Sequence, residues 1–389
     1  MKTVLKALCL AALCGVLFMV MRQRVQGAAP AAAEPSPTAA ASASPAPTPE
    51  PTPPPPPVPP PEYFTLSCIG DLTLTTNQFF SPESSAHYAY KMNGDYAYPF
   101  SNTIQYFEDD EYTLANLECT FSDEQIYSAQ RFYFLVPSDW VQIISAGGVD
   151  FLTTANNHSM DFFEKGMEET RETLDAAGIP YGLDGEPTVV TTPHGLKLGI
   201  YCGSYKDSSY VPNTDAAVEG VRQLQEAGAD YVICMFHWGE ELHYTPSEAQ
   251  VALAHACIDA GADLIYGSHP HCLQPVEEYN GGVILYSMAN WSFGGSTRPT
   301  DRDTAIAQIT LMRDTDGSVT NAGWDCIPCS VSSNLVDEDN YNDYKPTPYE
   351  PGTELYNRAM SKLLGAYEGS DINRDYSDID ASYGGGAEE

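Results

Sequence analysis

The feature that most constrains this chain is a short apolar run that recurs along the sequence and ends each time in side chains able to bind a metal ion. The runs, with their polar ends, are residues 64–69 before Gly70-Asp71, 112–115 before Asn116-Leu117-Glu118, 151–154 before Asn156-Asn157-His158, 231–236 before His237, and 264–266 before His269-Pro270-His271. Their β-branched and aromatic residues predict buried strands. Because sites in open α/β sheets form at the carboxyl ends of strands, we expect these ends to meet in one crevice.

Helical segments alternate with these strands. Residues 164–177 stop at Gly178, as a helix with a glycine C-cap does. Residues 215–227 and 247–260 are each followed by Gly-Ala-Asp and then a strand. This order predicts strand–helix–strand crossovers and at least partly parallel pairing. The sequence therefore predicts an α/β fold.

The N-terminal segment, residues 1–27, has the layout of an export signal. Lys2 and Lys6 precede an apolar stretch at residues 7–21, which is shorter than the ~20 residues of a comfortable membrane span. Two arginines follow this stretch, which leaves an uncleaved membrane anchor as the alternative to a cleaved signal peptide. In both cases we expect export, with the protein either anchored at the extracellular face of the cytoplasmic membrane or secreted.

Three further segments follow. Residues 28–61 are mostly Ala, Pro, Ser and Thr with almost no charge, which predicts a disordered Pro/Ala-rich linker. Residues 62–333 are long enough for one well-buried α/β domain. Residues 334–389 form an acidic tail, within which residues 353–367 have the apolar spacing of a helix that docks on the domain.

The charge balance excludes one class of partner. With 53 acidic and 18 basic residues, the formal net charge is −35, whereas nucleic-acid binding needs a basic surface. We therefore expect no nucleic-acid partner. Cation binding is compatible with this charge, although solubility alone also accounts for it.

The cysteines do not predict a metal site. Cys326-Ile327-Pro328-Cys329 resembles a redox pair, yet it follows a strand-like segment instead of a strand-to-helix turn. We expect either a structural disulfide there or none. The chain has no second Cys-x-x-Cys, so a cysteine zinc site is not expected. His255 falls in the middle of a predicted helix and is interpreted as a packed or surface residue, not a ligand.

Taken in order, these phrases resemble the CapA family, the bacterial capsule or poly-γ-glutamate synthesis proteins whose domain is related to calcineurin-like metallophosphoesterases. The resemblance runs from about Phe64 to Pro328, and its most specific stretches are residues 155–182, 236–241 and 261–293. It implies a four-layer αββα sandwich of the metallophosphoesterase type, with the site along one edge of a sheet.

The resemblance also implies a role for each polar strand end. Asp71 corresponds to the opening metal carboxylate, and Glu118 takes the place of the bridging carboxylate. The remaining implied ligands are Asn157, His237, His269 and His271. Together they would hold one or two divalent ions, with manganese, zinc and iron as the alternatives. His158 corresponds to the histidine that protonates a leaving group, and Asp161 would orient it.

Thr73 departs from the family pattern. Metallophosphoesterases typically open with Asp-x-His, and Thr73 stands where that histidine would be. Threonine is a poor ligand, so one metal position would have fewer protein ligands. We expect a single metal ion or a weakly held second one.

Two functions of different class are consistent with these residues. The first is an exported metal-dependent hydrolase that cleaves a phosphoester or a bond in a cell-envelope polymer. The second is a non-catalytic accessory protein that binds or guides an anionic polymer such as poly-γ-glutamate. The expected partners are such a polymer or its precursor and the membrane-bound capsule synthesis machinery. A relic that had lost its site would have lost ligand-type residues at random, whereas here the implied ligand set is nearly complete.

Overall fold

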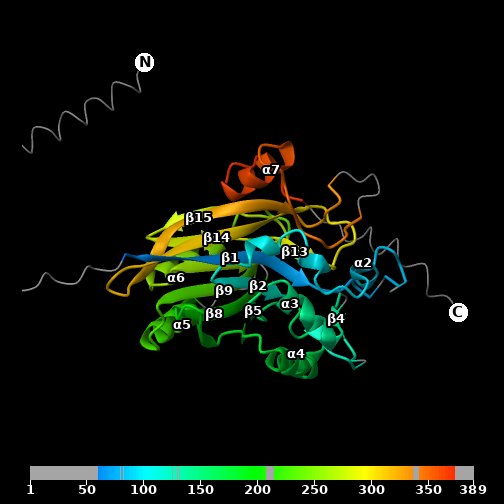
Figure 1. The fold of residues 1–389 in the computed structure, drawn as a ribbon, viewed down its shortest axis with the longest axis horizontal. Helices are drawn as coiled ribbons and strands as arrows, with labels where there is room; N and C mark the ends of the chain where they lie inside the picture. Colours follow the sequence, from blue (N-terminus) through cyan, green and yellow to red (C-terminus); the bar gives the residue numbers. More distant parts are fainter. Residues whose placement is uncertain are drawn as a thin grey trace, which may run out of the picture. The chain divides into compact units, whose positions relative to one another are not determined.

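Two β-sheets face each other, and helices cover their outer faces (Figure 1). The computed structural model describes residues 60–372 except 79, 82, 125, 129, 131, 207–213 and 336–340. The predicted signal or anchor at residues 1–27 lies outside this part of the chain, as does the predicted linker up to residue 59.

The larger sheet is built around β1, whose neighbours on one side are parallel and on the other antiparallel. Its order is β16 (Thr347–Pro348), β15 (Val319–Ser330), β14 (Asp303–Arg313), β1 (Glu62–Thr73), β2 (Tyr112–Leu117), β5 (Phe151–Thr153) and β6 (Tyr181–Gly182), and β13 (Asn290–Phe293) also pairs with β1. From β1 through β6 the pairing is parallel, so the carboxyl ends of β1, β2 and β5 lie at the same edge.

The smaller sheet has a parallel centre and two antiparallel edges. Its order is β11 (Val276–Tyr279), β12 (Gly282–Leu285), β10 (Leu264–Ser268), β9 (Tyr231–Gly239), β8 (Lys197–Lys206) and β7 (Pro187–Thr191). The pairs β8–β9, β9–β10 and β10–β12 are parallel. A separate two-stranded ladder joins β3 (Thr120–Phe121) to β4 (Leu135–Val136).

Helices connect the parallel strands, as the Gly-Ala-Asp phrases predict. The helices are α2 (Tyr88–Met92), α3 (Gln142–Ala146), α4 (Phe163–Ala177), α5 (Thr214–Glu226), α6 (Glu248–Asp259) and α7 (Glu354–Leu363), with short 3-10 turns at Tyr98–Phe100, Ile104–Tyr106 and Ser138–Val141. Helix α4 ends at Gly178, whose φ of 70° is accessible to glycine without strain. Helix α6 begins with a capping box between Ser247 and Gln250.

Three apolar clusters separate the layers. One lies between the sheets and includes Leu66 of β1 and Met235 of β9. A second packs helices α3 and α4 against the larger sheet, and a third packs α5 and α6 against the smaller sheet. This arrangement of helices, sheet, sheet and helices confirms the predicted four-layer α/β sandwich.

Helix α7 lies against β14 and β15 and contributes Ala359 and Leu363 to the cluster between the sheets. Cys326 and Cys329 both lie within β15, where they are buried free thiols. His255 is half-buried in α6, stacked on Tyr279 and paired with Glu277. Within the residues described, no helix is both long enough and apolar enough to cross a membrane.

Candidate metal centre

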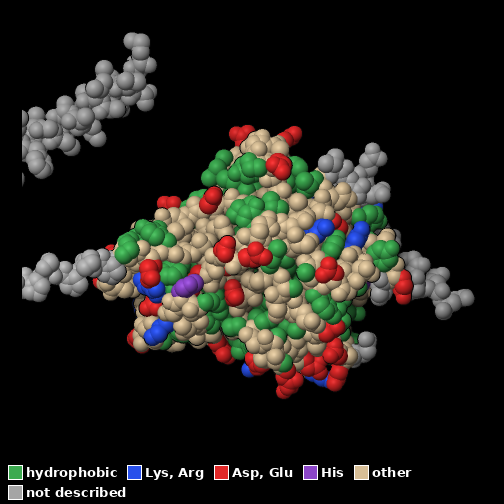
Figure 2. Space-filling model, viewed as in Figure 1, with side chains coloured by type: hydrophobic (Ala, Val, Ile, Leu, Met, Phe, Trp, Pro, Cys, Tyr) green, Lys and Arg blue, Asp and Glu red, His purple; other side chains and the backbone are tan. Residues whose placement is uncertain are grey.

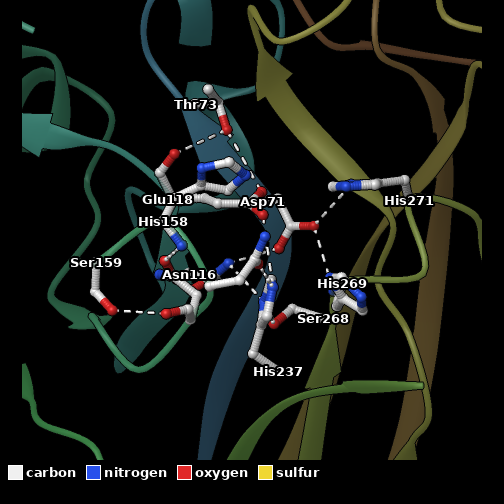
Figure 3. A network of polar contacts seen from close by, with 12 residues as sticks. Asp71, Thr73, Asn116, Glu118, His158, Ser159, His237, Ser268, His269 and His271 are labelled. Atoms are coloured by element: carbon white, nitrogen blue, oxygen red, sulfur yellow. Dashed lines mark hydrogen bonds and ion pairs between the residues drawn. The ribbon is translucent and has the colours of Figure 1, made fainter. Parts of the chain in front are cut away.

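The polar strand ends of both sheets meet at one edge of the sandwich (Figure 3). In the larger sheet, Asp71 of β1 pairs in register with Asn116 of β2, and Glu118 follows one residue after β2 ends. In the smaller sheet, His237 of β9 is in register with Ser268, the last residue of β10, and His269 comes next. Parallel pairing therefore brings carboxylates from one sheet opposite imidazoles from the other.

Two groups of three side chains have the spacing of metal ligands. The first is Glu118, His237 and His269, and the second is Asp71, Glu118 and His271. In each group the ligand atoms all lie within 4.8 Å of one another, and every member is buried. Glu118 belongs to both groups, so its carboxylate would serve whichever group holds an ion.

The charges in this cluster are strongly perturbed. Burial and the nearby Asp71 carboxylate raise the pKa of Glu118 well above its usual value. Burial and His271 lower the pKa of His269 to about 4, so this imidazole is neutral at pH 7. Burial alone would lower the pKa of His271, but its hydrogen bond to Asp71 and the charge of Glu118 prevail and raise it to about 9. The charged form of His271 is thus favoured by its contact with Asp71.

Two buried atoms in the cluster have no hydrogen-bond partner. They are Glu118 Oε1, whose contact with His237 Nε2 is 3.5 Å long, and His269 Nδ1. A buried polar atom without a partner costs about 1–3 kcal/mol. Both residues would act as donors to a divalent cation, and carboxylate with imidazole is a donor set suited to manganese, zinc or iron. The residues present therefore fit a metal ion.

Asn157 lies at the same cluster. Its Oδ1 atom accepts a hydrogen bond of 2.6 Å from His237 Nε2. His237 Nδ1 lies 3.0 Å from Ser268 Oγ and 3.3 Å from Asn116 Nδ2. These contacts fix the ring plane of His237.

His158 and Asp161 form a pair beside the carboxylates. His158 Nδ1 is 2.8 Å from Asp161 Oδ2, and Asp161 is almost fully buried. The same Oδ2 atom accepts the Phe134 backbone N–H at 3.2 Å, and the Phe134 ring packs edge-on against the His158 imidazole. A histidine held in this way by a carboxylate has the geometry of a general acid or base.

Thr73 is in contact with the bridging carboxylate. Its hydroxyl is fully buried and donates to the Glu118 carbonyl at 3.2 Å, with Glu118 Oε2 at 3.5 Å. The position where the metallophosphoesterase pattern implies a histidine thus lies at the cluster, and here it supplies a hydrogen bond to Glu118.

The backbone that carries the histidines is strained. His269 has a φ of 94° and His271 a φ of 53°, both in the region that residues with a side chain rarely adopt. Such conformations cost about 1–3 kcal/mol each and persist where the surroundings impose them. The turn therefore directs both imidazoles toward the carboxylates, and the packing of the fold compensates for its backbone strain.

Three asparagines position the ligands and were not assigned a role from the sequence. Asn116 Nδ2 donates to Asp71 Oδ1 at 2.8 Å. Asn156 Nδ2 donates to Asn116 Oδ1 at 3.0 Å, and Asn290 Oδ1 lies 2.9 Å from His271 Nδ1. Asn116 lies two residues before Glu118, and Asn156 lies directly before Asn157, so nearness to a predicted ligand is the signal that the sequence carries for these two. Asn290 begins β13 and has no predicted ligand beside it in the sequence.

The chain is similar in sequence to several known proteins. The family model described as bacterial capsule synthesis protein PGA_cap matches residues 65–294. The PGA biosynthesis protein CapA of Bacillus subtilis (strain 168) is 32% identical over 231 residues, covering 54% of this chain and 60% of that protein. The capsule biosynthesis protein CapA of Bacillus anthracis is 29% identical over 239 residues, covering 55% of this chain and 58% of that protein.

A probable polyglutamine synthesis accessory protein of Mycobacterium tuberculosis (strain ATCC 25618 / H37Rv) is 28% identical over 223 residues, covering 49% of this chain and 58% of that protein. The match to each of these relatives thus spans about three fifths of the relative's own length. Among solved structures, purple acid phosphatase PPD1 from yellow lupin (Lupinus luteus) seeds aligns with 67% of this chain and 53% of its own, with 12% identity and a TM-score of 0.31.

Proposed function

Since this chain belongs to the bacterial capsule synthesis protein family PGA_cap, we propose that it is an exported, metal-dependent hydrolase that acts on capsule, poly-γ-glutamate or another polymer of the cell envelope. The observation that carries the hydrolase is the pair of ligand groups that share Glu118. Divalent ions held there would lower the pKa of a bound water and stabilise the attacking and leaving oxygens of a displacement.

The protein's own residues would bind the cations, orient the ligands and donate a proton. Asp71 and Glu118 hold the negative charge that attracts the cations, and Asn116 and Asn157 fix the orientation of Asp71 and His237. Because Asp161 binds Nδ1 of His158, Nε2 is the atom left to hand a proton to the leaving group.

Charge decides how an anionic polymer would be held. Acidic side chains are spread over the face of the molecule in Figure 2, and the net charge of the chain is −35. A polyanion is repelled by such a surface. The proposed substrate therefore binds through the metal ions and a short local contact.

The test uses the full chain loaded with Mn²⁺, assayed for hydrolysis of p-nitrophenyl phosphate and of poly-γ-glutamate. His158→Ala should keep its metal and lose about 10²–10⁴-fold in rate, as expected on removing a general acid. His255→Ala is the matched control, because His255 pairs with Glu277 outside this cluster. A parent protein that binds metal but cleaves neither substrate would exclude this hydrolase activity.

A second candidate is a non-catalytic accessory protein that binds or guides the polymer. Thr73 favours it, because a threonine stands where the metallophosphoesterase pattern implies a histidine ligand, and its hydroxyl donates to the Glu118 carbonyl instead. One relative is itself named an accessory protein. This function predicts that poly-γ-glutamate binds the parent without cleavage and is released when the metal is chelated.

Export is proposed from the layout of residues 1–27. Fractionation of the producing cell is expected to recover the protein outside the cytoplasm. Recovery from the cytoplasm alone would contradict the proposal.

A further inference from the structure

A segment beyond the residues matched by the family model is tied to the loops that carry the metal histidines. The match ends at residue 294, whereas the described chain continues through α7 to residue 372. We propose that residues 354–372 are a positioning element of the metal centre, which hold the turn at His269 and His271 in its ligating conformation. This inference rests on the metal site of the proposed function.

The segment is anchored by buried ion pairs. Lys362 of α7 is 2% exposed, and its ammonium lies 2.6 Å from Asp301 Oδ2 and 2.8 Å from Asp303 Oδ2. Arg358 binds the same Asp303 through two of its nitrogens, at 2.6 and 2.8 Å. A buried ammonium is tolerated only where such partners surround it, so the position of α7 along β14 is closely defined.

From this anchor the chain reaches the loop that follows β9. The Lys362 ammonium lies 4.7 Å from the ring centre of Tyr244 and 5.1 Å from that of Tyr367, and the two rings pack edge to face. Asp371 Oδ1 accepts the Tyr244 backbone N–H at 2.9 Å. Ile372 N donates to the Leu242 carbonyl at 3.2 Å. Residues 367–372 thus cover this loop with both side-chain and backbone contacts.

The loop in turn holds the histidine turn. Leu242 N donates to the carbonyl of Pro270, the residue between His269 and His271, at 2.7 Å. Leu242 itself has a φ of 59°, like the two histidines an unfavourable conformation for a residue with a side chain. Three strained residues on two adjoining segments need an external constraint, and the segment beyond α7 is packed where it can supply one.

Packing beside the histidines supports the same connection. Leu242, Tyr244 and Cys272 form an apolar cluster that Tyr367 and Ile372 complete. Asp301, a partner of Lys362, lines a small cavity together with His271. The ion pairs of α7 and the metal histidine therefore border a common space.

The experiment is a Co²⁺ titration of the full chain followed by visible absorption, which reports both affinity and ligand geometry. Asp371→Ala removes the acceptor for Tyr244 N and should weaken Co²⁺ binding about 10-fold, the lower end of the effect of removing a direct partner of a ligand, because Asp371 acts on the histidines through the Tyr244 loop. Asp371→Asn keeps an oxygen at Oδ1 and should restore the parent affinity. Glu368→Ala removes the same charge from an exposed neighbour and should bind as the parent does.

A second variant, Tyr367→Ala, removes the ring contact and should weaken binding in the same direction. The melting temperature of the metal-free protein should differ little between Asp371→Ala and Glu368→Ala, because both positions are exposed. Parent-like affinity and spectra in both Asp371→Ala and Tyr367→Ala would overturn this inference and leave the proposed metal site intact. A parent that binds no Co²⁺ would overturn both.

Discussion

Glu118 is the residue on which the candidate centre depends most. It is common to both ligand groups, and its Oε1 atom is buried without a hydrogen-bond partner. Burial and Asp71 raise its pKa, which means that its negative charge is unfavourable in the metal-free protein. A buried charge that destabilises the metal-free protein and belongs to two ligand groups is typical of a functional residue.

Glu118→Gln should therefore separate function from stability. The amide has nearly the same shape but no charge, so the variant should lose detectable binding of divalent metal, measured by elemental analysis after dialysis. The metal-free variant should have a free energy of unfolding about 1–3 kcal/mol higher than that of the metal-free parent, because it buries no charge at this position and is not repelled by Asp71. A metal content equal to that of the parent would remove Glu118 from the site.

His269→Ala should have a narrower effect. His269 belongs to one ligand group and His271 to the other. The variant should lose the ion held by Glu118 and His237 and retain at most one equivalent, measured by elemental analysis. His255→Ala, in which a half-buried histidine outside the cluster is removed, should keep the full content.

At the scale of elements, the same hydrogen-bonded aspartate occurs at the beginning of three parallel strands. Asp150, Asp230 and Asp263 each exchange two hydrogen bonds with the first residues of the neighbouring strand: Asp150 with Thr113, Asp230 with Lys197, and Asp263 with Val232. In every case a carboxylate oxygen accepts a backbone N–H at 2.8 Å. The two Gly-Ala-Asp phrases and the similar Gly148-Val149-Asp150 thus set the register that brings the polar strand ends together.

Asp263 makes this device sensitive to pH. Burial raises the pKa of Asp263 from 3.8 to about 6, against the opposing effect of its hydrogen bond to Val232 N. Between these two values the folded state binds more protons than the unfolded state, so stability falls as the pH rises through this window. Asp263→Asn keeps an oxygen acceptor without a charge. Relative to the parent it should gain up to about 3 kcal/mol between pH 4 and pH 7.

Urea unfolding of parent and Asp263→Asn at the two pH values measures this difference. Asp230→Asn changes the equivalent residue of the preceding phrase, whose side chain is exposed, and is the matched control. An equal response of the two variants would contradict burial as the cause.

The docking of helix α7 depends on Lys362, a residue type that the sequence pattern would place on the surface. Lys362 lies between Asp301 and Asp303, and only Asp303 has a second cationic partner in Arg358. Lys362→Met should therefore cost about 3–5 kcal/mol of unfolding free energy, since it leaves buried carboxylate charge uncompensated. Adding Asp301→Asn to Lys362→Met should recover part of this loss in urea unfolding. No recovery would mean that the lost stability comes from packing and not from charge.

At the scale of the whole molecule, the sequence predicts the arrangement of helices and strands better than it predicts individual contacts between side chains. Period and composition predict α4 to within one residue, as residues 164–177 against Phe163–Ala177. Parallel strands share one edge, so residues at their ends are brought together whatever their partners. The hydrogen bond from Asn116 to Asp71 and the contact of Lys362 with Tyr244 join residues 45 and 118 apart. No local pattern encodes such pairs, because they depend on how two sheets and a distant helix pack.

The candidate metal centre would draw its ligands from both sheets, which would couple it to the stability of the whole unit. Asp71 and Glu118 come from the larger sheet, and His237, His269 and His271 come from the smaller one. An ion bound by these residues would link the two sheets. Because the site exists only in the folded state, metal binding would add directly to the free energy of unfolding.

Free Mn²⁺ at about 100 times its dissociation constant should stabilise the parent by about 2.7 kcal/mol. Thermal and urea unfolding with and without the metal measure this gain. Because the net charge is −35, any cation also relieves repulsion across the surface. KCl at equal ionic strength and the Glu118→Gln variant separate the two effects: the variant should respond to Mn²⁺ only as it responds to KCl. An equal gain from Mn²⁺ in parent and variant would mean that surface charge, and not a link between the sheets, accounts for the stabilisation.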